Sequence, residues 1–231
     1  MIKFNKEKRM KNISLLVLIF LVASCATPNP YAQWYTQYND DLLLPTEETE
    51  LVEVSPESFL STRDELFTQG YQLIGESNFN WDLKDRQLAV EHGRNISADK
   101  VVVTSDFTDS NTFTSGIMSY GVSAAPITST QRRFDQNALY FSKSIKKLKY
   151  GVYWDPLTGQ EKQKYEINNG LKIRVVVNNL PMFKAGLIPG DIILEIDGRK
   201  VLTDDDFYDD DNVSNLKIMR NGRVIDLTVN T

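Results

Sequence analysis

The stretch Lys184-Ala185-Gly186-Leu187-Ile188-Pro189-Gly190-Asp191-Ile192-Ile193-Leu194-Glu195-Ile196-Asp197-Gly198 decides the fold of the C-terminal part of this chain. Pro189-Gly190 is typical of a type II turn, because Pro fixes φ near about −65° and Gly accepts a positive φ. The apolar run that follows predicts a buried strand. Asp197-Gly198 then predicts a two-residue hairpin that leads into a return strand at 199–201.

This order of turn, buried strand and hairpin resembles the core of a PDZ domain of the bacterial type. The matching pattern is Ala185-Gly186-Leu187, Pro189-Gly190-Asp191, an apolar strand and Asp197-Gly198. A generic β-barrel turn that uses the same residues is the alternative. The resemblance covers about 146–231, where 171–177 matches a second strand and Asn221-Gly222 matches a final hairpin.

The segment Lys149-Tyr150-Gly151-Val152-Tyr153-Trp154 resembles the peptide-binding loop of PDZ domains in periplasmic trypsin-like proteases. That resemblance implies that an extended peptide pairs with this strand edge and that loop amides hold its terminal carboxylate. A groove helix is expected at 202–212, with Phe207 or Tyr208 facing the peptide. The expected peptide-binding residues are therefore Tyr150, Gly151, Val152, Tyr153, Trp154, Phe207 and Tyr208.

The expected groove helix carries six aspartates, Asp204–Asp206 and Asp209–Asp211. Asp is a poor residue for a helix interior, so a short helix of about two turns is expected. The acidic run has three interpretations: a solvated acidic face, selection for Lys or Arg upstream of the peptide C-terminus, or a calcium site. The spacing of an EF-hand, with its Gly and terminal Glu, is absent.

The first 24 residues predict a signal peptide. Five basic residues (Lys3, Lys6, Lys8, Arg9 and Lys11) precede an apolar region at 13–23, which is shorter than the roughly 20 residues of a membrane-spanning helix. Leu21-Val22-Ala23-Ser24-Cys25 resembles a bacterial lipobox, which implies lipidation of Cys25. An ordinary secreted protein with an incidental Cys is the alternative. Ala26, and not Asp, follows the cysteine. This resembles the pattern of Gram-negative lipoproteins that are sorted to the outer membrane, and it implies a position on the periplasmic side of that membrane.

Composition excludes several function classes. The chain has net charge −5, and removal of 1–24 takes away five positive residues and one negative, which leaves −9. Nucleic acid is therefore not an expected partner. One Cys and one His, Cys25 and His92, leave no disulfide within the chain and no Cys-based metal site, and they remove most acid/base and zinc residue sets. No Ser-His-Asp triad can be assembled around His92 from the sequence. We expect no catalytic residues, no metal and no cofactor.

Between the signal peptide and the PDZ-like segment, 25–54 contains three prolines and an acidic run, which favours a tether. Its aromatic residues either pack on the folded body, lie at the lipid surface or form a partner-binding strip. The segment 55–145 predicts a small α/β module: helices at about 55–70 and 83–92, and strands at 71–79, 100–105, 112–120 and 138–143. Asp82 is the expected N-cap of the second helix, and His92, in its last turn, is expected to contact helix carbonyls or solvent.

The predicted fold class is α+β, with the α/β module followed by a PDZ-like, partly open β-barrel with short helices (146–231). The 71–103 segment is also similar to the N-terminal module of small bacterial lipoproteins of unknown function. The main hypothesis is a non-enzymatic, lipid-anchored envelope adaptor that binds a protein C-terminus or an extended peptide. The alternatives are a structural lipoprotein with a vestigial, self-packed groove and a divergent envelope hydrolase. Oligomeric state is not predicted.

Overall fold

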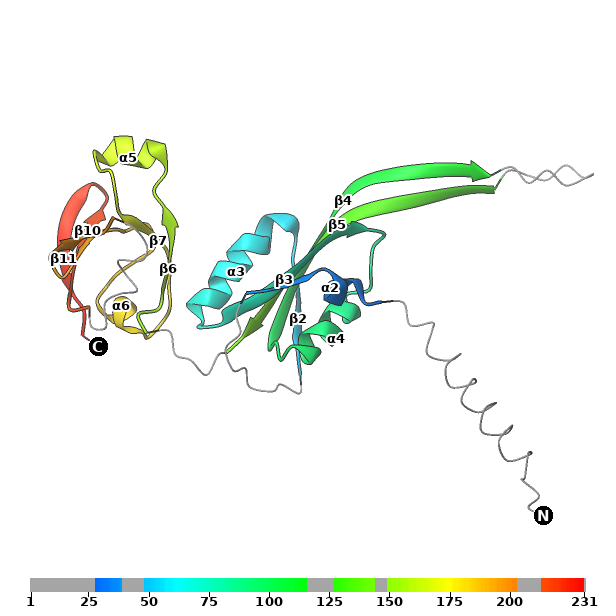
Figure 1. Cartoon of the computed structure of the whole chain (residues 1–231), viewed down its shortest axis with the longest axis horizontal. Coiled ribbons are helices and arrows are strands. Elements are labelled where there is room, and N and C mark those ends of the chain that lie inside the picture. Colours follow the sequence, from blue (N-terminus) through cyan, green and yellow to red (C-terminus); the bar gives the residue numbers. More distant parts are fainter. Residues whose placement is uncertain (1–27, 39–47, 116–126, 144–148, 203–212, 231) are drawn as a thin grey trace, which may run out of the picture.

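A computed structural model describes residues 28–38, 48–115, 127–143, 149–202 and 213–230. Two sheets organise these residues (Figure 1). The first sheet has the strand order β1-β3-β5-β4-β2, and the second has the order β11-β10-β8-β7-β6 with β9 beside β8. The mixed α and β content agrees with the sequence prediction, and the sheets do not close into a barrel.

The first sheet consists of β1 (Tyr35–Gln37), β2 (Glu50–Glu53), β3 (Gln72–Trp81), β4 (Lys100–Ser115) and β5 (Ile127–Ser142). β2 runs parallel to β4, and the other neighbours are antiparallel. Three helical segments precede or separate these strands: α2 (Pro30–Gln33), η1 with α3 (Pro56–Ser58 and Phe59–Thr68), and α4 (Gln87–Asn95).

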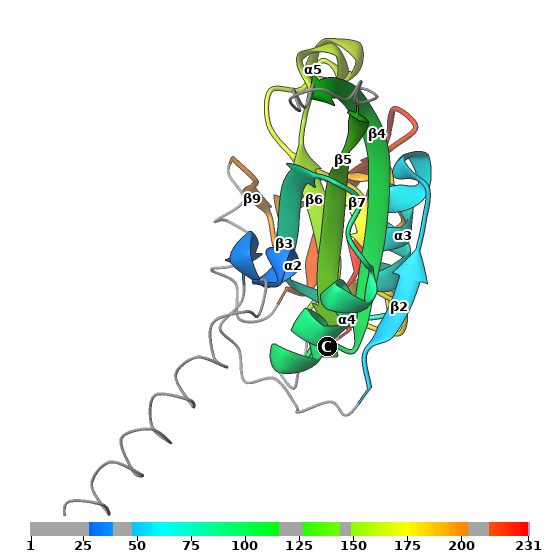
Figure 2. The same ribbon diagram turned by 90° about the vertical axis from the view of Figure 1, so that its right-hand side faces the viewer.

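Helices cover both faces of this sheet (Figure 2). Along β4, Val101 and Val103 pack with α2 and α4, whereas Val102 packs with Leu66 and Phe67 of α3. Successive side chains of a strand point to opposite faces, so a strand buried on both faces needs an unbroken apolar run. This explains why Lys100 is followed by three valines.

Part of the predicted tether belongs to this sheet. α2, β1 and β2 all lie within 25–54, and Tyr31 of α2 is 2% exposed. The hydroxyl of Ser77 donates a hydrogen bond of 2.6 Å to the carbonyl oxygen of Tyr31. Residues 30–37 and 50–53 are thus structured parts of the fold, and Tyr31 packs on the folded body.

Two further details differ from the sequence predictions. Helix α4 begins at Gln87 and ends at Asn95, and Asp82 pairs with Lys84 at 2.9 Å instead of capping it. His92 is 7% exposed and lies edge-on against Tyr35 and Tyr140, with ring centroids 4.7 Å and 5.2 Å away. The His92 ring is therefore buried among aromatic side chains. From the sequence, contact with helix carbonyls or solvent was expected.

The β4–β5 hairpin extends past its neighbours (Figure 1). β2 pairs with β4 only at 100–103, and β3 pairs with β5 only at 134–142. From Asp109 paired with Arg133 to Ser115 paired with Ile127, the two strands pair with each other alone among the described residues. The strands predicted at 100–105 and 112–120 are therefore parts of one long strand up to Ser115, beyond which 116–126 lies outside the described residues.

The second sheet consists of β6 (Val152–Pro156), β7 (Leu171–Val176), β8 (Ile192–Ile196), β9 (Arg199–Lys200), β10 (Asn215–Arg220) and β11 (Arg223–Thr228). The predicted turn precedes β8, where the N–H of Asp191 donates to the carbonyl oxygen of Ile188 at 3.2 Å and Gly190 has φ +92°. Asp197-Gly198 joins β8 to β9, and Asn221-Gly222 joins β10 to β11, as predicted.

Two short helices connect these strands. α5 (Gly159–Tyr165) lies between β6 and β7, and α6 (Pro181–Lys184) follows β7. Ile173, Met182 of α6, Ile193, Ile196, Leu216 and Ile218 are each at most 1% exposed and form the centre of the core. This core fixes the position of β6 at the edge of the sheet.

A shared apolar cluster connects the two sheets. Leu66 and Phe67 of α3 pack with Val175 of β7 and Tyr153 of β6. Nearby, the N–H of Asn178 donates to the carbonyl oxygen of Thr68 at 3.0 Å. Arg174 lies 3.6 Å from Asp64 of α3 and 3.3 Å from Asp155 of β6. We call the first sheet with its helices the first module. The face of the second sheet that carries Tyr153 is thus the face that contacts the first module.

Candidate peptide-binding edge

β6 is an edge strand of the second sheet, at the opposite end of the strand order from β11. It pairs with β7 on one side, and within the described part of the chain no strand pairs with its other side. Pro156, which has no backbone N–H, ends the strand, and proline is tolerated in sheets at such edges. An edge strand presents backbone donors and acceptors that another extended chain can use.

The ladder geometry places the backbone of Val152 on the outer side. The N–H of Val177 donates to the carbonyl oxygen of Gly151 at 2.7 Å, so Gly151 and Val177 are bonded neighbours. In an antiparallel ladder, bonded and non-bonded pairs alternate. Val152 faces Val176 in the next pair, and its N–H and C=O therefore point away from β7.

Gly151 is required by the loop itself. Its φ of +71° favours glycine, and a Cβ added there would lie 2.4 Å from Cδ1 of Leu180 and 3.0 Å from Cβ of Val177. The protein's own Leu180 therefore occupies the space into which a side chain at Gly151 would point. A larger residue at this position would displace the loop.

The other predicted residues of this segment have separate environments. Tyr150 is 6% exposed in the core, and its hydroxyl accepts a hydrogen bond of 3.0 Å from the N–H of Val213. Val152 and Trp154 pack partly against the same core, whereas Tyr153 faces α3. Phe207, Tyr208, the six aspartates of 204–211 and Cys25 lie outside the described residues.

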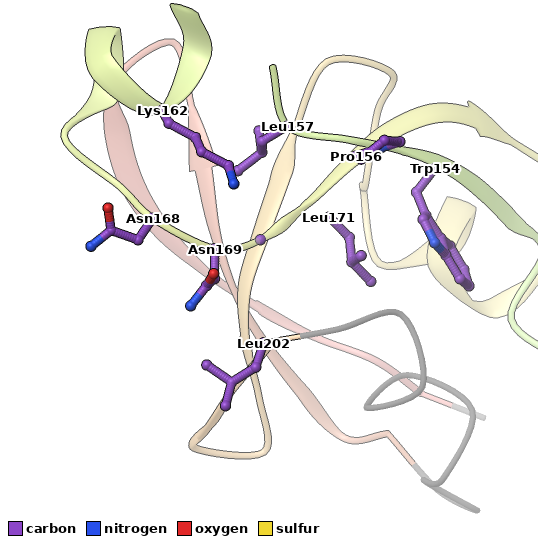
Figure 3. A pocket seen from close by; sticks show the side chains of 9 residues that line it. Trp154, Pro156, Leu157, Lys162, Asn168, Asn169, Leu171 and Leu202 are labelled. Carbon is purple, nitrogen blue, oxygen red and sulfur yellow. The ribbon is translucent and has the colours of Figure 1, made fainter. Parts of the chain in front are cut away.

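A pocket of about 280 Å³ lies beside the end of β6 (Figure 3). Trp154 and Pro156 line it from β6, Leu202 lines it from the chain after β9, and Lys162 reaches it from α5. Asn168 and Asn169 complete the polar part of the wall. A wall that combines apolar and polar side chains can hold one side chain of an extended chain that pairs with β6.

Of the five predicted peptide-binding residues that the structure describes, Trp154 is the one that lines this pocket. The sequence did not predict that Lys162, Asn168 and Asn169 line a pocket, and Leu202 was expected at the start of the groove helix. A usable signal was present: Thr158 and Glu161 form a capping box at the start of α5. Hydrogen bonding to Lys172 and to Thr158 lowers the pKa of Glu161 to about 2, so its carboxylate stays charged at neutral pH.

The described residues contain no group of three or more His, Cys, Asp or Glu side chains that could hold a metal ion. Within the same ranges, no helix is both long and apolar enough to cross a membrane. The calcium interpretation of the aspartates concerns residues outside those ranges.

No family model matches this chain, and no curated protein matches it. Among solved structures, two chains of the HtrA-type protease AlgW, each with a decapeptide, match it in part. One is 18% identical, with a TM-score of 0.31, over 51% of this chain and 40% of its own length. The other is 20% identical, with a TM-score of 0.29, over 39% of this chain and 35% of its own length. This chain therefore matches well under two thirds of either protease chain.

Proposed function

We propose that this protein is a lipid-anchored envelope protein that binds a protein C-terminus or an extended peptide along the outer edge of β6, without catalysing a reaction. The PDZ-like motifs around Pro189-Gly190 and Gly151 support the proposal at the level of sequence. The observation that carries it is the outward-facing backbone of Val152 on an edge strand that no described strand covers.

Backbone hydrogen bonds would supply most of the affinity. A peptide that adds to β6 as a further strand exchanges bonds with Val152, and a side chain two positions along enters the pocket lined by Trp154 and Leu202. Lys162 gives that pocket a positive charge, which suits an acidic or carbonyl-bearing residue in the ligand. The aspartates after Leu202 lead to the opposite expectation, a preference for Lys or Arg in the bound peptide. The sequences of the peptides that bind will distinguish these two preferences.

Lipid attachment at Cys25 would hold this site at the periplasmic face of the outer membrane. Two partners on one surface have a raised effective concentration, so a modest affinity suffices. Replacing Cys25 with Ala should release the protein from the membrane fraction. A mutant that stays with the membranes after a carbonate wash would contradict anchoring at this residue.

The test of the peptide site is a matched pair of substitutions at Val152 in the full chain. Val152→Pro removes the outward N–H, whereas Val152→Ala keeps that N–H and shortens the side chain. A displayed library of free C-terminal peptides should enrich binders on the wild type and on Val152→Ala, and should lose them on Val152→Pro. Circular dichroism checks that both variants fold. Equal enrichment on all three proteins would contradict binding along β6.

The contact between Tyr153 and α3 favours a second candidate, a structural protein in which the second sheet serves to pack on the first module. Tyr153 lies on the face opposite to Trp154, so this packing uses the sheet face and does not require the edge. In the structural case the library would enrich nothing above background on the wild type.

A further inference from the structure

An exposed aromatic surface lies on the first module, away from β6. Trp81 of β3 is opposite Phe134 of β5, and Phe134 is opposite Phe107 of β4, so the three rings form a row across the sheet. The rings of Phe107 and Phe134 are 5.6 Å apart. Trp81 is 50% exposed and Phe107 is 54% exposed. A contiguous exposed patch of large aromatic side chains commonly marks a surface that binds a partner or a membrane.

This row continues into an apolar pocket of about 420 Å³ at the start of the described chain. Its apolar lining comes from Pro28, Pro30, Trp34, Phe79, Trp81 and Leu88. Trp34 is 53% exposed, and the amine of Lys84 lies 5.8 Å from the Trp81 ring. We call the row and this pocket together the aromatic face.

The position of the aromatic face in the chain indicates what covers it. Pro28 lines the pocket and is also the first described residue. Cys25 is three residues upstream, which is at most about 10 Å of extended chain. With the lipid that we propose on Cys25, the acyl group would enter the bilayer and the bilayer surface would lie within that reach of the aromatic face.

We infer that the aromatic face docks on the surface of the bilayer that holds the lipid on Cys25. This inference rests on the lipid anchoring proposed above. Trp side chains are enriched at the boundary between head groups and acyl chains, because their rings are amphipathic. Lys84, although paired with Asp82, can extend its amine toward lipid phosphates while its methylene chain stays beside Trp81. Docking would fix the orientation of the module instead of leaving it to swing on its anchor.

Fluorescence of the three tryptophans tests this orientation. The chain contains Trp34, Trp81 and Trp154, and Trp154 belongs to the second sheet. The full-length lipidated protein is reconstituted into phosphatidylethanolamine vesicles that contain brominated phosphatidylcholine, in which bromine on the acyl chains quenches nearby rings. The Trp154→Phe variant keeps Trp34 and Trp81, so its emission reports on the aromatic face. The double variant Trp34→Phe/Trp81→Phe keeps only Trp154, which is the control position on the second sheet. Phe at these sites keeps an aromatic ring, and circular dichroism checks folding.

Flotation of the vesicles is scored before fluorescence, so the two ideas can fail separately. Co-flotation with a loss of Trp34 and Trp81 emission, and with unchanged Trp154 emission, is the expected result. Co-flotation with no quenching in Trp154→Phe would overturn docking while leaving the anchor intact. Equal quenching of all three rings would also overturn it, because no single face would then be turned to the lipid. Protein that stays at the bottom of the gradient would overturn the anchor, and the docking inference with it.

Discussion

Phe67 of α3 and Tyr153 of β6 stack with ring centroids 4.1 Å apart and an interplanar angle of 18°. The pair joins the two modules, since α3 belongs to the first sheet and β6 to the second. The same cluster contains Leu139 and Phe141 of β5 and Val175 of β7. The modules thus share one apolar cluster, and we expect them to unfold together.

Phe67→Ala should therefore separate the unfolding of the two modules. Phe67 is 4% exposed, and truncation of a buried Phe costs about 3–5 kcal/mol. Calorimetry should show one transition for the wild type and two for the variant. Phe183→Ala is the matched control, because Phe183 is 47% exposed and its loss should leave one transition. A single transition for Phe67→Ala, shifted as a whole, would contradict coupling through this pair.

The turn before β8 depends on an ion pair between Asp191 and Arg220. Asp191 is 1% exposed, and its two carboxylate oxygens accept hydrogen bonds of 2.7 Å from Nε and Nη2 of Arg220. The carboxylate also accepts a bond of 2.9 Å from the N–H of Ile188, while Arg220 donates to the carbonyl oxygen of Gly186. The aspartate of the Pro-Gly-Asp motif is therefore a structural residue.

Asp191→Ala should destabilise the protein by about 1–3 kcal/mol, because Arg220 and the N–H of Ile188 lose their buried acceptor. In a double-mutant cycle, addition of Arg220→Met should recover part of the loss, since the unpaired charge is then absent. Urea unfolding of the four proteins measures the coupling. Strictly additive losses would show that the two side chains act independently.

Local signals in the sequence predicted the second sheet well. The turns at Pro189-Gly190, Asp197-Gly198 and Asn221-Gly222 depend on the φ preferences of adjacent residues, so they can be recognised without knowledge of the fold. β1 and β2 were missed because strands of three and four residues are too short for a periodic pattern. They form only by pairing with residues far along the chain, such as Tyr35 with Ser77 and Glu50 with Lys100.

The candidate site was predictable only in part for the same reason. The edge position of β6 followed from its place in the motif, but the contact of Tyr153 with Phe67 joins two segments with no sequence relationship. The contact of Leu180 with Gly151 likewise depends on how the chain folds back after β7. The pocket residues outside the strands come from two connections, the one between β6 and β7 and the one after β9 that contains Leu202.

Gly75 should tolerate no side chain, because a Cβ there would lie 2.3 Å from the hydroxyl oxygen of Tyr35. That hydroxyl donates to the carbonyl oxygen of Ile74 at 3.1 Å, so Tyr35 holds β1 against β3. Gly75→Ala should cost about 1–3 kcal/mol of unfolding free energy by overpacking. Gly159→Ala is the control, since a Cβ there meets no atom within 4 Å. Equal stability of the two variants in urea would contradict the role of Tyr35.

His92 should make the stability of the first module depend on pH. Its Nε2 is buried and has no hydrogen-bond partner within the described residues, and burial lowers the pKa of the imidazole. Tyr35 beside it remains neutral throughout, because burial raises its pKa to about 12. The folded protein therefore binds a proton less readily than the unfolded chain, in which His titrates near about pH 6.5.

The direction in which stability changes with pH follows from this difference between the folded-state and unfolded-state pKa of His92. Stability should be full above about pH 6.5 and should fall as the pH drops below this value, until the folded-state pKa of His92 is reached. His92→Phe keeps a ring between Tyr35 and Tyr140 but cannot take up a proton, so it should remove this loss. Urea unfolding at pH 7.5 and at pH 5.5 compares the two proteins above the range in which most carboxylates titrate. If the variant loses as much stability as the wild type between these pH values, His92 is not the group responsible.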